Sequence, residues 1–261
     1  MTKRERLPSK PIPIARSIAW KPLDDSYHML ASMLAESGHN YVLLATQKFL
    51  AAAEGHAAAS AAPGGPSPFA VMFGRLYRCS KSELRYAVID ELKPPPPAVL
   101  SDAGRPDVQK LRQFVHDEGQ KGDRRIVGWL AALDEAAPRL PLPAERLQAE
   151  CFPESWQSAL VVVPSLAYSS GGFYRYSVRA QRTCQVPFYE LIEGTAPKRG
   201  ERKRTVIEWC NYVTPEPVLR PGVPEAPPSN GSGTNGGSPF KPIGEMFSRV
   251  RGRVGGDRGV P

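Results

Sequence analysis

Two spacings of apolar residues alternate between residues 23 and 194. Stripes such as Phe49, Leu50 and Ala53 are typical of amphipathic helices, whereas a continuous apolar run such as residues 159–163 is typical of a buried strand. Helices are expected at residues 24–38, 46–61, 107–120 and 144–152, and strands at residues 41–45, 69–78, 84–92, 124–133, 158–163, 172–176 and 186–192. One sheet with flanking helices predicts an α/β fold.

Local signals support these boundaries. Thr46 can cap the second helix, and the turn at residues 63–66 ends it. The polar turn at residues 80–83 is expected to join two strands as a hairpin. The continuous apolar strand at residues 158–163 is expected to be central in the sheet and covered on both faces.

Charge separates the chain into a near-neutral middle and basic ends. The net charge is +8, of which residues 1–22 carry +5 and residues 195–261 carry +5, while residues 23–194 carry −2. The Pro, Gly and Ser content of residues 221–242 is that of a linker. The predicted organisation is a basic N-terminal tail (1–22), a domain (23–194), a basic extension with an apolar docking segment (195–220), a linker (221–242) and a basic segment (243–261), with disordered tails.

Composition argues against several classes of protein. No apolar run reaches the 18 residues that a membrane-spanning helix needs, and no apolar core of a signal peptide follows the basic N-terminus, so a cytoplasmic location is expected. The four cysteines are far apart, which favours reduced thiols over a disulfide framework or a zinc site. Phosphate-loop and dinucleotide-binding motifs are absent from the sequence, and no cofactor is predicted.

The order of several short motifs is informative. A Gly-Trp strand (128–129) precedes a helix ending in Phe-Pro (152–153), then Trp-Gln (156–157) and an apolar strand ending at Pro164, and finally Phe-Tyr-Arg-Tyr (173–176). In this order the segment resembles the MPN/JAB family, and with upstream and closing strands the resemblance covers about residues 40–193. It implies an MPN/JAB-like (cytidine-deaminase-like) mixed β-sheet flanked by helices.

The resemblance also identifies positions for catalysis. Active members are zinc isopeptidases that cut ubiquitin or ubiquitin-like tails, and the positions of their general base, two imidazole ligands, serine and aspartate ligand correspond here to Ser67, Ala131, Leu133, Pro141 and Ala144. Alanine, leucine and proline cannot coordinate a metal ion. Asp134, Glu135 and Glu145 lie beside the lost positions, but carboxylates alone favour hard ions over hydrolytic zinc.

The resemblance therefore implies a metal-free, degenerate member of the family, a pseudoenzyme that acts as a scaffold or adaptor. Its expected partner is a protein, such as an active MPN/JAB subunit or a ubiquitin-like protein. Two alternatives stay open. One is an accessory protein that binds nucleic acid or an anionic surface through the basic clusters at residues 199–204 and 249–253; the other is a residual metallo-isopeptidase.

Aromatic side chains outside the core are the expected anchors of a partner interface. Trp209 and Tyr212 are the strongest candidates, because they lie beyond the predicted domain. The further candidates are Met246, Phe247, Arg249 and Arg251 in the C-terminal segment, and Trp20 and Trp156. For Trp156, packing in the core is the favoured interpretation.

Overall fold

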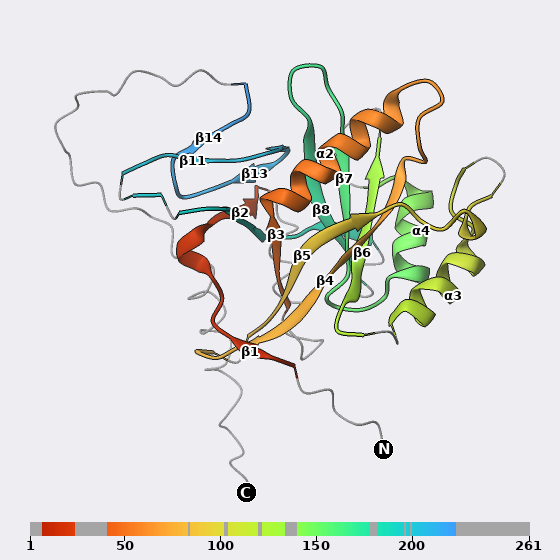
Figure 1. Cartoon of the computed structure of the whole chain (residues 1–261), viewed down its shortest axis with the longest axis horizontal. Helices are drawn as coiled ribbons and strands as arrows, with labels where there is room; N and C mark the ends of the chain where they lie inside the picture. Colours follow the sequence, from red (N-terminus) through yellow and green to blue (C-terminus); the bar gives the residue numbers. More distant parts are fainter. Residues whose placement is uncertain are drawn as a thin grey trace, which may run out of the picture. The chain divides into compact units, whose positions relative to one another are not determined.

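The computed structural model describes residues 7–23, 41–82, 84–101, 104–119, 122–133, 140–177, 182–195, 197–198 and 200–222. The described residues all belong to one compact unit, which ends at Val223. The fold below is that of this unit (Figure 1). Within the described residues, no helix is long and apolar enough to cross a membrane.

The described unit consists mostly of strands. The strands are β1 (Ser9–Lys10), β2 (Ser17–Pro22), β3 (Tyr41–Thr46), β4 (Phe69–Cys79), β5 (Arg85–Lys93), β6 (Arg125–Ala132), β7 (Ser158–Val163), β8 (Ser170–Ser177), β9 (Arg182–Gln185), β10 (Phe188–Leu191), β11 (Lys203–Arg204), β12 (Glu208–Trp209), β13 (Tyr212–Val213) and β14 (Val218–Leu219). The helices are α2 (Gln47–Ala61), α3 (Val108–Gly119) and α4 (Leu142–Cys151), with short 3₁₀ turns η1 (Ile14–Arg16) and η2 (Pro97–Val99).

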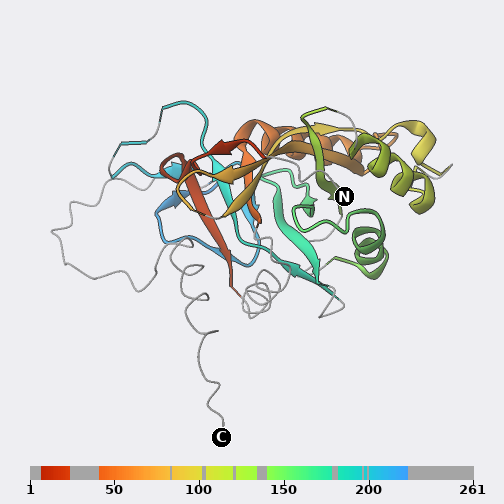
Figure 2. The same cartoon turned by 90° about the horizontal axis from the view of Figure 1, so that it is seen from below.

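Twelve of the strands form one mixed sheet in the order β12-β8-β7-β6-β4-β5-β3-β10-β2-β13, with β1 paired to β4 and β9 paired to β8. The sheet curls strongly, as Figures 1 and 2 show. The strands β11 and β14 pair separately. Neighbouring strands pair in both directions: β6 and β7 are parallel, whereas β7 and β8 are antiparallel.

The predicted fold class is wrong. Strands account for 41% of the structure and helices for 23%, and the sheet is a curled half-barrel rather than the helix-flanked α/β sheet of an MPN/JAB-like fold. Part of the difference lies in the regions that were predicted as tails. Residues 17–22 form β2, and residues 203–219 contribute four further short strands.

Successive side chains of a strand point to opposite faces of the sheet, and the central strands therefore have a buried layer of side chains on each face. Phe69 and Val71 of β4 join an apolar cluster with residues of α3 and α4, whereas Ala70 and Met72 point to the opposite face. The helix α2 packs against β5 and β6 and buries Phe49, Leu50, Ala53 and Ala57. The strand β7 is buried on both faces, as its continuous apolar sequence predicted.

Many local predictions are confirmed. The helices α2, α3 and α4 and the strands β3 to β8 and β10 fall within a few residues of the expected ranges. The hydroxyl of Thr46 accepts a hydrogen bond from the backbone N–H of Phe49 at 3.2 Å, which is the predicted cap. The helix expected at residues 24–38 lies outside the described residues.

Candidate functional site

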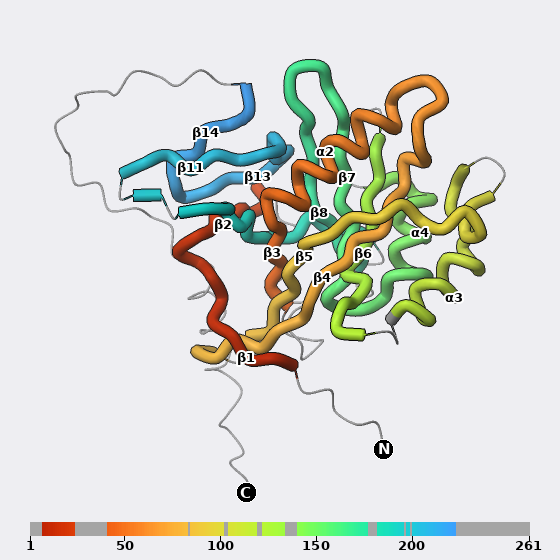
Figure 3. The backbone as a smooth tube through the Cα atoms, viewed as in Figure 1, coloured from red at the N-terminus to blue at the C-terminus, as the bar shows by residue number. Residues whose placement is uncertain are grey.

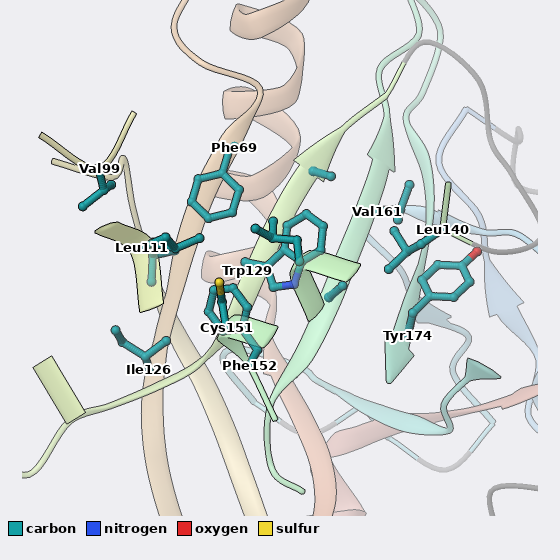
Figure 4. Close-up of a cluster of buried hydrophobic side chains, with 14 of the residues drawn as sticks. Phe69, Val99, Leu111, Ile126, Trp129, Leu140, Cys151, Phe152, Val161 and Tyr174 are labelled. Atoms are coloured by element: carbon teal, nitrogen blue, oxygen red, sulfur yellow. The ribbon is translucent and has the colours of Figure 1, made fainter. Parts of the chain in front are cut away.

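Three of the positions that the resemblance assigned to catalysis meet in one apolar cluster. Ala131, at the end of β6, belongs to the cluster, and Leu133 and Ala144 pack against it. Figure 4 shows the cluster around Trp129, whose ring stacks on Phe69 at 5.6 Å and on Phe152 at 6.1 Å between centroids. These positions therefore carry packed alkyl side chains.

The other two positions have structural roles. The hydroxyl of Ser67 donates to the carbonyl oxygen of Gly104 at 2.8 Å and so fixes the turn before β4. Pro141 is exposed and lies directly before the first turn of α4, where a proline is well tolerated. None of the five side chains presents a ligand of the kind that holds hydrolytic zinc.

Of the three neighbouring carboxylates, the structure describes Glu145, which has hydrogen-bond partners of its own. Glu145 is buried in α4 and accepts hydrogen bonds from the backbone N–H of Thr183 at 3.0 Å and from its hydroxyl at 2.6 Å. Asp134 and Glu135 lie outside the described residues. Among the described residues, no three His, Cys, Asp or Glu side chains are grouped so that they could hold a metal ion.

The cysteine at the end of α4, Cys151, is buried. Cys151 ends α4 in the apolar cluster, and its burial raises the pKa of the thiol to about 11. A thiol with so high a pKa is almost entirely protonated at neutral pH and is a weak nucleophile. All four cysteines are free thiols.

The strongest predicted partner-binding residues are buried. Trp209 and Tyr212 are each 2% exposed, and Trp20 is 1% exposed. The expectation that Trp209 and Tyr212 lie outside the domain is wrong, because β12 pairs with β8 and β13 pairs with β2. The apolar segment around them docks on the domain, as predicted for residues 195–220.

These side chains form an aromatic cluster around Phe188 of β10. The ring of Phe188 lies 4.5 Å from Trp209, 4.8 Å from Phe173 and 5.4 Å from Tyr212 between centroids. The hydroxyl of Tyr212 donates toward the carbonyl oxygen of Val186 at 2.9 Å and accepts from the backbone N–H of Phe173 at 3.2 Å. The cluster thus holds the C-terminal strands on the sheet and is part of the core.

A buried carboxylate anchors the same region. Glu190 is fully buried, and its two oxygens accept five hydrogen bonds. The donors are the indoles of Trp20 and Trp209, the hydroxyl of Thr205, the amide of Gln47 and the backbone N–H of Val206. Burial raises the pKa of Glu190, and the hydrogen bonds oppose that rise. The carboxylate is therefore a structural hub that joins β2, α2 and the C-terminal segment.

Of the remaining candidates, Trp156 is half-buried and packs edge-on against Tyr41 with ring centroids 5.6 Å apart, in keeping with packing at the core. Met246, Phe247, Arg249 and Arg251 lie outside the described residues.

The described surface carries a groove between η2 and α3, here called the α3–η2 groove. It is a shallow groove, open to solvent, with a volume of about 560 Å³. Its lining residues are Pro96, Ala98, Val99, Gln109, Lys110, Gln113, Phe114, Asp117 and Glu118. Val99 is buried and Phe114 half-buried at its floor, and Lys110 and Asp117 stand exposed at its rim. An apolar floor with a charged rim is the arrangement of many protein-binding surfaces.

Sequence reasoning missed both the α3–η2 groove and Glu190. The groove joins two elements that lie about ten residues apart, so no single local pattern in the sequence marks it. Glu190 had a detectable signal, because a carboxylate within the apolar strand at residues 188–191 requires buried donors.

The comparisons with known proteins add no family. A scan against protein-family models gave no match, and a search of curated proteins gave none either.

Proposed function

We propose that this chain is a non-catalytic protein-interaction module and that it holds a protein partner in the α3–η2 groove. The observation that carries the proposal is the groove itself, with its apolar floor of Val99 and Phe114 and its charged rim. Partner helices and extended peptides bind such grooves by placing an apolar anchor on the floor and polar groups along the rim.

The chemistry of the five matched positions supports a binding role over hydrolysis. Ala131, Leu133 and Ala144 fill their space with alkyl groups that neither bind a metal ion nor move a proton. Replacement of polar ligands by packed apolar groups is also favourable for the stability of a core. A scaffold needs no catalytic or metal-binding side chain at these positions.

We propose, from the sequence resemblance alone, an MPN/JAB subunit or a ubiquitin-like protein as the partner to test first. We further propose a cytoplasmic location, which suits the four free cysteines, because thiols stay reduced in that compartment.

The test is a comparison of two matched arginine substitutions in the full chain. Ala98→Arg places a long cation in the α3–η2 groove, whereas Ala58→Arg places the same side chain on the exposed face of α2. Proteins captured by each variant and by the wild type are quantified by mass spectrometry, and binding of purified ubiquitin is measured by NMR titration of the labelled chain.

We expect Ala98→Arg to capture at least about tenfold less of a protein that the wild type captures, which is equivalent to about 1.4 kcal/mol of binding free energy. Ala58→Arg should capture the same amount of that protein as the wild type. Equal capture by the two variants would remove the groove as the binding surface. Loss of the same protein from both variants would point to a general effect of added charge and would also contradict the proposal.

A further inference from the structure

The strand β1 runs beside the end of β4 (Figure 3). A second, basic groove is lined by residues from this part of the unit. It encloses about 380 Å³. Its polar lining includes the cations Lys10, Arg75 and Arg125, the ring of Tyr77 and the single carboxylate of Asp123. We call this the β1–β4 groove, and it shares no lining residue with the α3–η2 groove.

The strands fix the positions of these cations. Lys10 is held in register with Cys79 by the parallel pairing of β1 and β4, and Arg125 of β6 pairs with Gly74 of β4. Arg75 follows Gly74 directly along β4. Charged groups on strands lose less conformational freedom on binding than those on loops, so the cations are preorganised for a ligand.

Aromatic packing supports one wall of the groove. The ring of Tyr77 stacks on Tyr86 with centroids 5.1 Å apart and planes 20° apart, and the ammonium of Lys10 lies 5.3 Å from the centre of the Tyr77 ring. Tyr86 is buried, which anchors the pair to the sheet. The groove therefore combines a fixed aromatic side chain with cations, which is a combination found in single-strand nucleic-acid sites.

The guanidinium of Arg75 remains available to a ligand. Its side chain is 46% exposed, and its ion pair with Asp90 is long, at 3.5 Å between nitrogen and oxygen. An exposed ion pair of this length contributes little to stability, and the guanidinium can readily exchange Asp90 for a stronger acceptor. A phosphate accepts two parallel N–H hydrogen bonds from one guanidinium, and this bidentate interaction is stronger and more specific than a single long ion pair.

The surrounding sequence adds positive charge to this end of the sheet. Arg78 and Arg85 face each other across β4 and β5 at the same end of the hairpin. Several cations on one surface are matched by a polymer with one negative charge per unit better than by a single small anion.

We propose that the β1–β4 groove binds the phosphate backbone of a single-stranded nucleic acid without base specificity. An arginine fork matches the geometry of phosphate and of carboxylate alike. The ring of Tyr77 beside the cations is the feature that favours a nucleic acid over an acidic peptide. This inference is independent of the protein partner proposed for the α3–η2 groove.

The experiment compares two triple variants of the full chain that lose the same charge. Lys10→Ala, Arg75→Ala and Arg125→Ala empty the groove of cations, whereas Lys48→Ala, Arg112→Ala and Arg146→Ala remove three cations from α2, α3 and α4. Binding of a fluorescein-labelled oligothymidylate of about 20 nucleotides is measured by anisotropy over a series of salt concentrations, from about 50 mM upward.

We expect the groove variant to bind at least about tenfold more weakly and to reduce the slope of log K against log salt by about 2, since each phosphate contact contributes about 0.7 for single strands. The control triple variant should keep both affinity and slope within about twofold of the wild type.

Equal losses in the two triple variants, or an unchanged groove variant, would overturn the proposal. Competition by polyglutamate as potent as by unlabelled oligothymidylate would assign the groove to acidic peptides and would overturn it too. If the triple variant unfolds, the single exposed change Lys10→Glu gives the same test, with thermal melting followed by circular dichroism as the check on folding.

Discussion

At the scale of single residues, Glu190 shows how a buried charge is accommodated. Five neutral donors converge on its two oxygens, so that their hydrogen bonds offset the cost of removing the carboxylate from water. The donors come from β2, α2 and the 205–209 segment, which are distant in sequence. One residue thereby couples the N-terminal and C-terminal ends of the described unit.

Glu190→Gln tests this role. The amide of glutamine has one acceptor oxygen, and an NH₂ group replaces the other oxygen of the carboxylate. At least two of the five donors would then face this NH₂ group and lack an acceptor. We expect the free energy of unfolding to fall by about 1–3 kcal/mol, measured by urea denaturation near neutral pH. Unchanged stability would mean that the five hydrogen bonds do not form together in solution.

The same residue predicts a pH dependence. Because the pKa of Glu190 lies above its usual value of 4.5, the folded state keeps the proton at pH values where the unfolded chain has released it. The free energy of unfolding contributed by this group therefore falls as pH rises from 4.5 through the folded pKa. Urea denaturation at several pH values across that range should show a smaller decrease in the free energy of unfolding for Glu190→Gln than for the wild type. An identical dependence on pH in both proteins would contradict a raised pKa for Glu190.

Gly128 and Gly55 form a matched pair of glycine-to-alanine tests. Gly128 in β6 has φ = 147°, and a Cβ there would overlap the carbonyl oxygen of Ser158 in β7. We expect Gly128→Ala to cost about 1–3 kcal/mol or more from backbone strain alone. Gly55 lies in α2, where a Cβ would meet no other atom within 4 Å, so Gly55→Ala should stabilise by about 0.5–1 kcal/mol. Thermal melts of the two variants should therefore shift in opposite directions.

At the scale of elements, the C-terminal strands belong to the domain. The strands β12 and β13 extend the two ends of the main sheet, and Trp209 and Tyr212 pack on Phe188. Loss of one large buried aromatic side chain costs about 3–5 kcal/mol, compared with a total stability of about 5–15 kcal/mol for a typical domain. Removal of the whole segment therefore removes much of the margin of stability.

Two truncations test this conclusion. A chain of residues 1–194 lacks β11 to β14, and we expect it to be unfolded or aggregated. A chain of residues 1–222 keeps every described strand and should melt within a few degrees of the full chain. Circular dichroism and size-exclusion chromatography distinguish the two outcomes, and a cooperative melt of 1–194 at the full-length temperature would show that the C-terminal strands are dispensable.

Most elements were predictable because their signals are local. Phe49, Leu50 and Ala53 mark the buried face of α2, and Thr46 caps it, so neighbouring residues alone determine that helix. The apolar run of β7 likewise reports burial on both faces. These signals do not depend on which strands lie next to each other.

The fold class was not predictable in the same way. β11 to β14 are two-residue strands in a basic, Pro-rich sequence, and they are held by long-range contacts such as the indole of Trp209 with Glu190. β2 lies in a segment with net positive charge, which favoured interpretation as a tail. Long-range pairing overrode local composition, and the sheet therefore gained strands that the pattern did not indicate.

The candidate sites divide in a similar way. The sequence alone shows that Ala131, Leu133 and Ala144 have alkyl side chains, and these side chains meet in one cluster because the helices and strands lie where they were expected. The exposure of the aromatic side chains could not be predicted from the sequence. Trp209 and Tyr212 looked isolated along the chain, but they pack on β10 across the sheet.

At the scale of the whole molecule, the packed alkyl positions predict that the chain does not hydrolyse isopeptide or peptide bonds of ubiquitin-like substrates. We expect the full chain with added zinc to leave linear di-ubiquitin intact, because Ala131 and Leu133 offer no zinc ligand. Gel electrophoresis of the substrate gives the readout, with an active zinc isopeptidase in the same buffer as the control. Cleavage that a chelator abolishes would contradict the prediction.

The central claim is that the chain acts by holding a protein in the α3–η2 groove. The most direct measurement is photo-crosslinking from the groove, with benzoylphenylalanine in place of Gln113 and, in a control chain, in place of His116, which is exposed on the same helix but does not line the groove. We predict a discrete crosslinked protein from position 113 and none from position 116. No adduct from position 113, or the same adduct from both positions, would contradict the account.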